Sequence, residues 1–393
     1  MDNDFGLDVE LFPKELTLLL SLMRMEQGKG VPSNNKEWLN DIDWGLFLQL
    51  ARHHRIYPVL YTNIKKVDGA GIPLHVIQTL HKEYQSNIFQ MLYISAEMEH
   101  ICKQFSEHHI RTLLLKGPVL AADLYGELAL RTCGDLDILT PINDLDRAEE
   151  LLEKLGYVKD DYIETILDDW KWRHHHITFF HPHKRIKLEI HWRLSPGPGK
   201  EPSFNELWER RRISTLTGHP VYFLGSEDLF LFLVTHGARH GWSRLRWLTD
   251  IDQITQKRLD WNKINMLLHE YQYLHLGGQA LILASRLLHT PISKEMEALT
   301  AVKRSNRLAQ DALFYIKQMV NLHTDPVPED VAKYHKRHLF ALMSKQQKFL
   351  FIASFLYPYP KDAETLPLPA NLHFLYFPLR PFLWVWRKAR KHA

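Results

Sequence analysis

The stretch RTCGDLDILT, residues 131–140, places two acidic residues within a short apolar run. Its alternation is typical of a β-strand, so Asp135 and Asp137 share one face while Leu136 and Ile138 share the other. An unpaired carboxylate is costly to bury, and two carboxylates about 6.5–7 Å apart along a strand repel each other. The stretch therefore predicts a strand with one face in the core and the other beside a bound cation.

A third acid stands in the segment KLEIHW, where Glu189 and His191 face the same way on a strand. If this strand lies beside the first, then Asp135, Asp137 and Glu189 form a cluster of three carboxylates. Carboxylate and phosphate oxygens are the ligands that Mg²⁺ prefers, and Mn²⁺ binds similar sites. We therefore predict these three acids as metal ligands and catalytic residues for displacement at phosphorus, with His191 on the substrate side.

Residues able to bind phosphate stand close to these acids. Lys116 ends a short strand candidate, IRTLLLK, and Gly117 lets a ligand approach the backbone closely. Arg131 and Gly134 belong to the pattern R-x-x-G-D-x-D, and an arginine suits bidentate phosphate contacts. A helix beginning at Pro118 offers its N-terminus to an anion. The alternative is structural, with Lys116 and Arg131 serving only as ion-pair partners for the aspartates.

Helical periodicity and chain breakers divide the sequence into three regions. Residues 1–106 hold apolar residues at helical spacing, and residues 201–393 return to amphipathic helices after the linker SPGPGKEP. Between them, residues 107–200 run strand, helix, strand, helix, strand, strand, which describes a small mixed sheet with helices on one side. We therefore expect an α+β fold in which a minimal core is flanked by N- and C-terminal helical regions.

The segments LLLKGPVLAADLYGELALRTCGDLDILT and KLEIHWRL resemble the uncharacterised nucleotidyltransferase group of the polymerase-β-like nucleotidyltransferase superfamily. The resemblance is specific over residues 112–194 and looser through THGARHGWSRLRWLTDID. It implies a polymerase-β-like core with Asp135 and Asp137 as the metal-binding pair and Glu189 as the third carboxylate. Gly117 matches the turn glycine of the superfamily.

The sequence departs from the superfamily at one position. Many active members carry Gly-Ser or Gly-Gly at the turn, whereas here Pro118 follows Gly117 and has no N–H to donate. Lys116 would then take over the contact to the terminal phosphates. Proteins of this group are also associated with peptide natural products, including lasso peptides, which implies a modified peptide as one acceptor.

Several histidines allow more than one explanation. His236 and His240 have the spacing of a zinc-binding pair on a helix, but the glutamate of a zinc protease is missing between them. Together with Arg239 they are expected to line the acceptor side of the site or to cap the core. The run at residues 174–176 is expected to be structural or solvated, because at most two of its members share a strand face.

Composition limits the partners and the compartment. A net charge of +3 over 393 residues is too small for a nucleic-acid footprint, so no nucleic acid is expected. Two cysteines, no secretory signal and no run of about 18 apolar residues predict a cytoplasmic protein without a transmembrane segment. The C-terminal segment FLYFPLRPFLWVWRKARKHA is aromatic and then basic. We expect it to pack against the helical region, the alternative being an anionic membrane surface.

These observations favour a Mg²⁺-dependent nucleotidyltransferase that moves a nucleotidyl group from a nucleoside triphosphate such as ATP to an acceptor hydroxyl or phosphate. Two alternatives stay open. In a nucleotide-sugar-dependent glycosyltransferase, the D-x-D motif would bind one metal and Glu189 would be idle. In a non-catalytic nucleotide- or peptide-binding module, the fold would persist without turnover, and Pro118 is the feature that points there.

Overall fold

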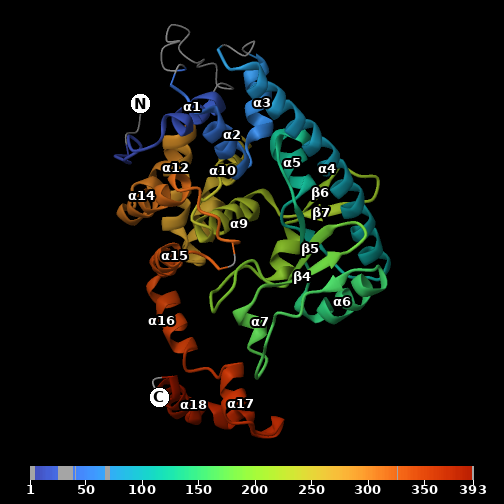
Figure 1. The fold of residues 1–393 in the computed structure, drawn as a ribbon. Helices are drawn as coiled ribbons and strands as arrows, with labels where there is room; N and C mark the ends of the chain where they lie inside the picture. The colour runs from blue at the N-terminus through green and yellow to red at the C-terminus, as the bar shows by residue number, and fades with distance from the viewer. Residues whose placement is uncertain (1–4, 25–38, 40, 67–70, 325, 392–393) are drawn as a thin grey trace.

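A computed structural model gives the fold of the chain (Figure 1). It describes residues 5–24, 39, 41–66, 71–324 and 326–391. The protein is α+β as expected, with one mixed sheet and helices before and after it. Within the described residues, none of the helices has the length and apolar character needed to cross a membrane.

Seven strands form the sheet in the order β3-β4-β5-β2-β1-β7-β6. Their bounds are β1 (Leu113–Leu114), β2 (Asp135–Leu139), β3 (Val158–Lys159), β4 (His176–His181), β5 (Ile186–His191), β6 (Arg212–Ser214) and β7 (Val221–Phe223). β2 pairs with β5, and β1 with β7, in parallel, while the other neighbouring pairs are antiparallel. Because β6 and β7 follow the linker at residues 195–202, the sheet extends beyond the expected core.

Helices cover one face of this sheet. The long helix α4 (Leu74–Glu107), together with α5 (Pro118–Tyr125) and α6 (Leu145–Lys154), buries its apolar side there. Leu136 and Ile138 of β2 lie in the same core and are fully buried. The alternation of β2 therefore places its apolar residues under the helices and leaves its acids on the opposite face.

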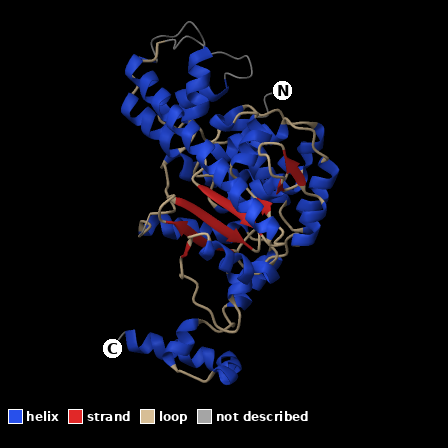
Figure 2. Ribbon diagram, turned by 90° about the vertical axis from the view of Figure 1, so that its right-hand side faces the viewer, coloured by secondary structure: helices blue, strands red, loops and turns tan. Residues whose placement is uncertain are grey.

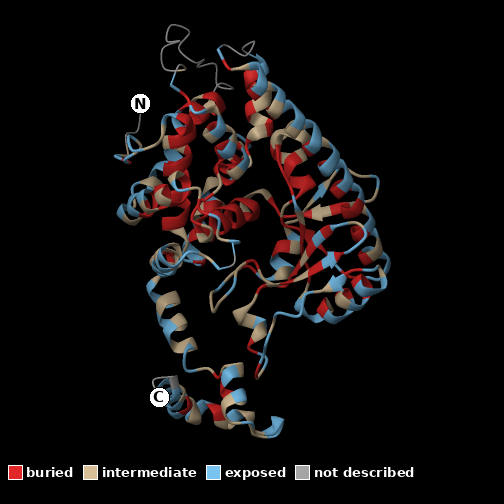
Figure 3. Cartoon of the chain, viewed as in Figure 1, coloured by how far each residue is buried: buried red, intermediate tan, exposed pale blue. Residues whose placement is uncertain are grey.

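The helices before and after the sheet share a second core instead of forming separate regions. Those that contribute buried side chains to it are α1 (Lys14–Met23), α2 (Trp44–His53), α3 (Tyr57–Lys66), α8 (Phe204–Glu209), α9 (Ser226–Arg239), α10 (Leu245–Thr255), α11 (Trp261–Glu270), α12 (Leu274–Leu288), α13 (Lys294–Thr300), α14 (Lys303–Lys317) and α15 (Glu329–Leu342), with α4 and α5 reaching both cores. Figure 3 shows the buried residues concentrated on α1, α9 and α12. This packing brings segments from both ends of the chain to the other face of the sheet.

The last helices, α16 (Lys345–Ser354), α17 (Pro360–Thr365) and α18 (Tyr376–Lys391), extend away from both cores (Figures 1 and 2). Tyr376 and Leu383 of α18 are buried in a small separate cluster with Ile166. This cluster holds α18 against α17 and the loop before α7 (Trp170–Arg173). The expectation that the C-terminal segment packs against the helical region is therefore wrong, because its anchor is this third cluster and its aromatic side chains other than Tyr376 stay exposed.

Candidate functional site

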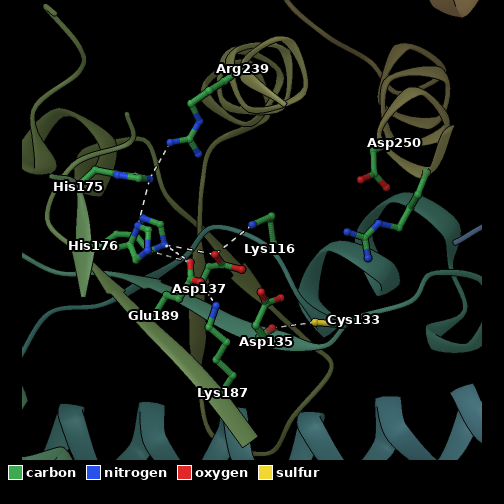
Figure 4. Close-up of polar contacts among 12 residues, drawn as sticks. Lys116, Cys133, Asp135, Asp137, His175, His176, Lys187, Glu189, Arg239 and Asp250 are labelled. Carbon is green, nitrogen blue, oxygen red and sulfur yellow. Dashed lines mark hydrogen bonds and ion pairs between the residues drawn. The ribbon is translucent and has the colours of Figure 1, made fainter. Parts of the chain in front are cut away.

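The acidic faces of β2 and β5 meet on the side of the sheet opposite α4, α5 and α6. The strands pair in parallel, with Asp137 opposite Glu189 and Asp135 opposite Lys187. This pairing confirms the expected adjacency of the two strands. Asp137 is fully buried and the Glu189 side chain is 13% exposed. Figure 4 shows the carboxylates on the same side of the sheet, an arrangement that a nearby cation must stabilise.

Two nitrogen donors approach the Asp137 carboxylate. Lys116 Nζ lies 3.0 Å from Oδ1, and His191 Nε2 lies 3.2 Å from the same oxygen. His191 Nε2 is also 3.4 Å from Glu189 Oε2, so the imidazole bridges the two acids. Burial alone would lower the pKa of His191, but hydrogen bonds to Asp137 and Glu189 raise it above the usual value. His191 therefore lies inside the carboxylate cluster, and not merely at its substrate side.

Both acids of the cluster are held ionised. Burial would raise the pKa of Asp137, but Lys116 and the hydrogen bond from His191 lower it below the usual value. Burial likewise opposes ionisation of Glu189, whose pKa is lowered mainly by the hydrogen bond from His191, with a further contribution from the charge of Lys116. Lys187 Nζ donates to Glu189 Oε1 over 2.7 Å and adds to this effect. Two ionised carboxylates facing each other are the ligand set that a divalent cation requires.

One oxygen of the cluster lacks a donor. Asp137 Oδ2 is buried, and among the described residues it accepts no hydrogen bond. A buried carboxylate oxygen without a partner is costly, and a bound metal ion would satisfy it. Asp137, Glu189 and His191 each offer one ligand atom, and these atoms lie within 4.8 Å of one another. The residues thus fit Mg²⁺ or Mn²⁺, and the imidazole nitrogen also suits a transition-metal ion.

Asp135 lies at the outer end of the acidic face. It is half-buried and belongs to no group of three mutually close ligand atoms in the described part of the chain. Its side chain points to the same side of β2 as that of Asp137 (Figure 4). Asp135 therefore remains a predicted metal ligand that stands apart from the compact group formed by the other two acids and His191.

The turn between β1 and α5 carries Lys116 to the cluster. Gly117 has φ +96°, a conformation that L side chains rarely adopt, so this turn favours glycine. Pro118 is the first residue of α5, where a missing N–H has no helical partner to lose. The departure from Gly-Ser or Gly-Gly at this turn thus has a local structural reason. Phosphate binding by Lys116 remains a prediction, since here the ammonium group contacts Asp137.

Arg131 does not belong to the cluster. Its guanidinium is 1% exposed and donates to both carboxylate oxygens of Asp250 on α10, at 2.9 and 3.0 Å. Tyr125 donates to the same carboxylate over 2.8 Å. The geometry therefore corrects the expected phosphate contact of Arg131, which instead ties the segment before β2 to α10. Gly134 is exposed, and a Cβ at this position would meet open space, so neither its conformation nor its surroundings demand glycine.

Two histidines that the sequence analysis assigned a structural or solvated role extend the cluster. Arg239 Nη1 donates to His175 Nε2 over 2.8 Å, and His176 Nδ1 lies 3.1 Å from the same nitrogen. Since arginine only donates, His175 Nε2 is an acceptor, and His176 therefore donates through Nδ1. This leaves His176 Nε2, 3.8 Å from Glu189 Oε2, as the unprotonated nitrogen. Burial lowers the pKa of His176 to about 4, which agrees with a neutral ring.

The remaining predicted acceptor-side residues lie differently. Arg239 reaches the cluster through His175, as described above. His236 and His240 instead pack their rings on Trp247, with centroid distances of 5.5 and 5.2 Å. Burial lowers the pKa of both histidines well below the usual value. Neither belongs to a group of three metal-ligating residues in the described chain, so the structure favours a packing role over a zinc pair.

A cavity adjoins Arg239 on the side away from the acids. Its volume is about 310 Å³, and its walls come from the linker at residues 195–199 and from α9, α12, α15 and α16. Apolar side chains such as Leu276, Leu342 and Phe351 supply much of the wall. Arg239 thus lines this apolar cavity and also contacts His175 at the edge of the acidic cluster.

Comparison with known proteins places the chain in a family. A family model described as an uncharacterised nucleotidyltransferase matches residues 40–289. The match confirms the family resemblance and extends it on both sides of residues 112–194, from α2 to the end of α12. Among curated proteins, no match was found. The matched span contains both the sheet and most of the second helical core.

Proposed function

The chain belongs to the uncharacterised nucleotidyltransferase family, and we propose that it transfers a nucleotidyl group from a nucleoside triphosphate to an acceptor hydroxyl or phosphate. Family membership supports the general role in nucleotidyl transfer. The observation that carries the finer proposal is the pairing of Asp137 with Glu189 on neighbouring parallel strands, with Asp137 Oδ2 left without a donor. Such a pair is suited to a divalent cation that also binds the triphosphate.

Asp137 and Glu189 would hold Mg²⁺ or Mn²⁺, with Asp135 at the outer end of the same face. When bound, the metal would neutralise charge on the phosphates and favour a deprotonated acceptor oxygen. Lys116, 3.0 Å from Asp137, is close enough to turn toward the phosphates. His191 bridges the two acids, and its hydrogen bonds lower the pKa of both. These residues therefore act by positioning and charge neutralisation, which is the main requirement of phosphoryl-group chemistry.

The two alternatives fare less well on the same observations. A glycosyltransferase with a single metal would leave Glu189 idle, yet its carboxylate shares His191 with Asp137. A non-catalytic module was favoured by Pro118 alone, and the position of this residue at the start of α5 accounts for it. We therefore retain nucleotidyl transfer as the function that the geometry supports best.

We propose that the acceptor carries an apolar group that enters the cavity beside Arg239. The cavity of about 310 Å³ has mainly apolar walls, and Arg239 links it to His175 at the edge of the acids. A modified peptide, which the family resemblance implied, offers such a group next to a hydroxyl or phosphate. Leu342→Asp would place a charge in this wall and is expected to raise the KM for the acceptor more than the KM for the nucleotide.

Intact-mass analysis tests the reaction type. The protein is incubated with Mg²⁺ or Mn²⁺, each nucleoside triphosphate and a panel of peptide acceptors with apolar residues beside serine or phosphoserine. A gain of one nucleotide mass, lost in Asp137→Asn and kept in the exposed control Asp161→Asn, supports the proposal. A gain of one sugar from a nucleotide sugar would establish the glycosyltransferase instead. Absence of metal–nucleotide binding in calorimetry would exclude both enzymes.

We also propose that α18 binds an anionic membrane surface. Its buried face holds Tyr376 and Leu383, while its other faces expose large apolar side chains. These are Phe377, Phe382, Trp384, Val385 and Trp386. Lys388 and Arg390 are exposed next to them, and no acidic residue follows Glu364 in the sequence. Exposed aromatic groups combined with positive charge match the interface of an anionic bilayer.

Vesicle co-sedimentation tests this surface. Binding is expected to vesicles of phosphatidylcholine with phosphatidylglycerol, more weakly to phosphatidylcholine alone, and less at high salt. Phe382→Ser should reduce binding, whereas Phe89→Ser on α4 should not, although the two side chains are equally exposed at 73% and 74%. Equal binding by all three proteins would refute the assignment. Concentration-dependent dimerisation that Phe382→Ser abolishes would identify a second copy as the occupant.

A further inference from the structure

Three arginines from distant segments meet beside the start of β2. Arg55 lies between α2 and α3, Arg244 precedes α10, and Arg246 stands in its first turn. The two segments are joined at His54: Arg246 N donates to the His54 carbonyl oxygen over 3.2 Å, and Leu245 N donates to His54 Nδ1 over 3.3 Å. The second helical core therefore brings the three residues near one another, so that the charge of Arg244 acts on Arg55 and the charge of Arg246 acts on Arg244.

The same place adjoins the predicted metal ligands. Arg246 Nη1 donates to the hydroxyl of Thr132 over 3.0 Å and to its carbonyl oxygen, just before Gly134 and Asp135 in the chain. A cavity of about 440 Å³ opens here, and Arg55, Thr132 and Gly134 are among the residues that line it. Ser86, Asn87 and Gln90 of α4 form another part of its wall, so an anion in this cavity would lie beside Gly134, the residue before Asp135.

In the described part of the chain the three arginines form no ion pair, although the charge of Asp135 acts on Arg55 and Arg244 and that of Asp250 on Arg246. Among the described residues, no carboxylate oxygen lies within 4.0 Å of a side-chain nitrogen of Arg55, Arg244 or Arg246. Arg246 Nε is buried and has no hydrogen-bond partner. Burial and the neighbouring guanidinium groups lower the pKa of Arg244 and of Arg246 to about 10. Arg131, by contrast, is fully satisfied by Asp250.

The backbone at Arg55 turns the chain out of α2. Its φ of +55° lies in the left-handed region that commonly follows the last turn of a helix, and Ile56 N donates to the Ala51 carbonyl oxygen over 3.2 Å to cap that turn. Here the contacts of His54 with Leu245 and Arg246 hold the segment in place.

We propose that Arg55 and Arg244 bind the terminal phosphates of the triphosphate, with Arg246 adding charge and positioning the Thr132 segment. The ligand class is a polyphosphate, because several guanidinium groups without ion pairs match several anionic oxygens. The assignment rests on the proposed nucleotidyl transfer, in which a metal held by Asp137 would bind the same triphosphate. It gives the chain the phosphate-binding arginines that Arg131 does not supply.

Calorimetry with Mg²⁺ and either inorganic triphosphate, ATP or AMP tests the assignment. Arg55→Met and Arg244→Met are each expected to weaken triphosphate and ATP binding about 10- to 100-fold, from the loss of charged hydrogen bonds. AMP, with a single phosphate, should bind weakly and change little. Arg52→Met is the matched control, because Arg52 lines the same cavity but pairs with Glu83 at 2.5 Å. It should change binding less than about 3-fold.

The outcomes separate this proposal from the proposed function. Folded Arg55→Met and Arg244→Met proteins that bind inorganic triphosphate as tightly as the natural chain would overturn the arginine assignment, even if nucleotidyl transfer is found. A natural chain that binds no triphosphate would overturn it as well. Weakened binding in both variants, together with unchanged transfer in Asp137→Asn, would support the phosphate site and contradict the catalytic proposal.

Discussion

Replacing Asp137 with asparagine removes one charge from the centre of the cluster and keeps its shape. Oδ1 of the natural residue accepts from Lys116 at 3.0 Å and lies 3.2 Å from His191 Nε2, while among the described residues Oδ2 has no donor. The asparagine oxygen can keep the Oδ1 contacts, and the amide nitrogen then occupies the position of the oxygen that a metal would use. The substitution thus separates metal binding from packing.

The expected effects follow from these contacts. Removing one partner of a buried ion pair costs about 3–5 kcal/mol. Part of this is recovered because repulsion with Glu189 disappears, so we expect a loss of unfolding free energy of about 3 kcal/mol or less. A unit charge 4 Å from another is worth about 4 kcal/mol at an effective dielectric constant of 20. Part of this energy is offset by the cost of removing water from the metal and the carboxylate. We therefore expect Mn²⁺ to bind the variant at least about 100-fold more weakly, which corresponds to about 2.7 kcal/mol of binding free energy.

Two measurements check this prediction without knowledge of the acceptor. Electron paramagnetic resonance of free Mn²⁺ gives the metal affinity, and urea unfolding in EDTA gives the stability. Once an acceptor is known, kcat/KM should fall about 1,000-fold or more, as expected for loss of metal-based charge stabilisation. A folded Asp137→Asn protein with natural Mn²⁺ affinity would refute the assignment of Asp137 as a metal ligand. Asp161→Asn, at an exposed position, is the control for charge alone.

Three further predictions concern stability. Arg131→Met should lower the unfolding free energy by about 3–5 kcal/mol in urea titration, because it leaves the buried Asp250 carboxylate without its partner. The additional change Asp250→Leu should restore much of this loss. A loss below about 1 kcal/mol in Arg131→Met would contradict the importance of the buried pair. Gly117→Ala should lower the unfolding free energy by about 1–2 kcal/mol, measured as a lower Tm, because alanine is strained at a φ of +96°. No steric clash adds to this cost, since the new Cβ would lie 3.8 Å from its nearest neighbours. Stability in EDTA should also fall from pH 7.5 to pH 5, because burial lowers the pKa of several histidines below the unfolded value of about 6.5, so that the unfolded chain binds more protons. The three whose pKa falls to about 4 are His176, His275 and His335. His191, whose pKa is raised, opposes this trend with stability that is lost as pH rises, and equal or greater stability at pH 5 would show that its term dominates.

Local signals in the sequence predicted the framework of the site. Alternation placed Asp135 and Asp137 on one face, and the same rule placed Glu189 on the matching face of its strand. The glycine and proline after Lys116 predicted a turn and a helix start, which the structure bears out. These features depend on the backbone conformations of neighbouring residues, which a single sequence records directly.

The charges around that framework were decided by tertiary structure. Arg131 finds its partner 119 residues away, and Arg239 meets His175 across 64 residues. No periodic pattern encodes such pairs, because they arise where apolar packing brings distant segments together. For this reason the sequence misassigned Arg131.

The sequence alone therefore determined which strand faces carry acids, where the turn lies and to which family the chain is similar. Tertiary structure decided which cations meet those acids, and that Arg55 reaches the start of β2 because helices from both ends of the chain share one core. The physical reason is range: backbone preferences act over a few residues, whereas burial and ion pairing act between whatever segments the core brings together.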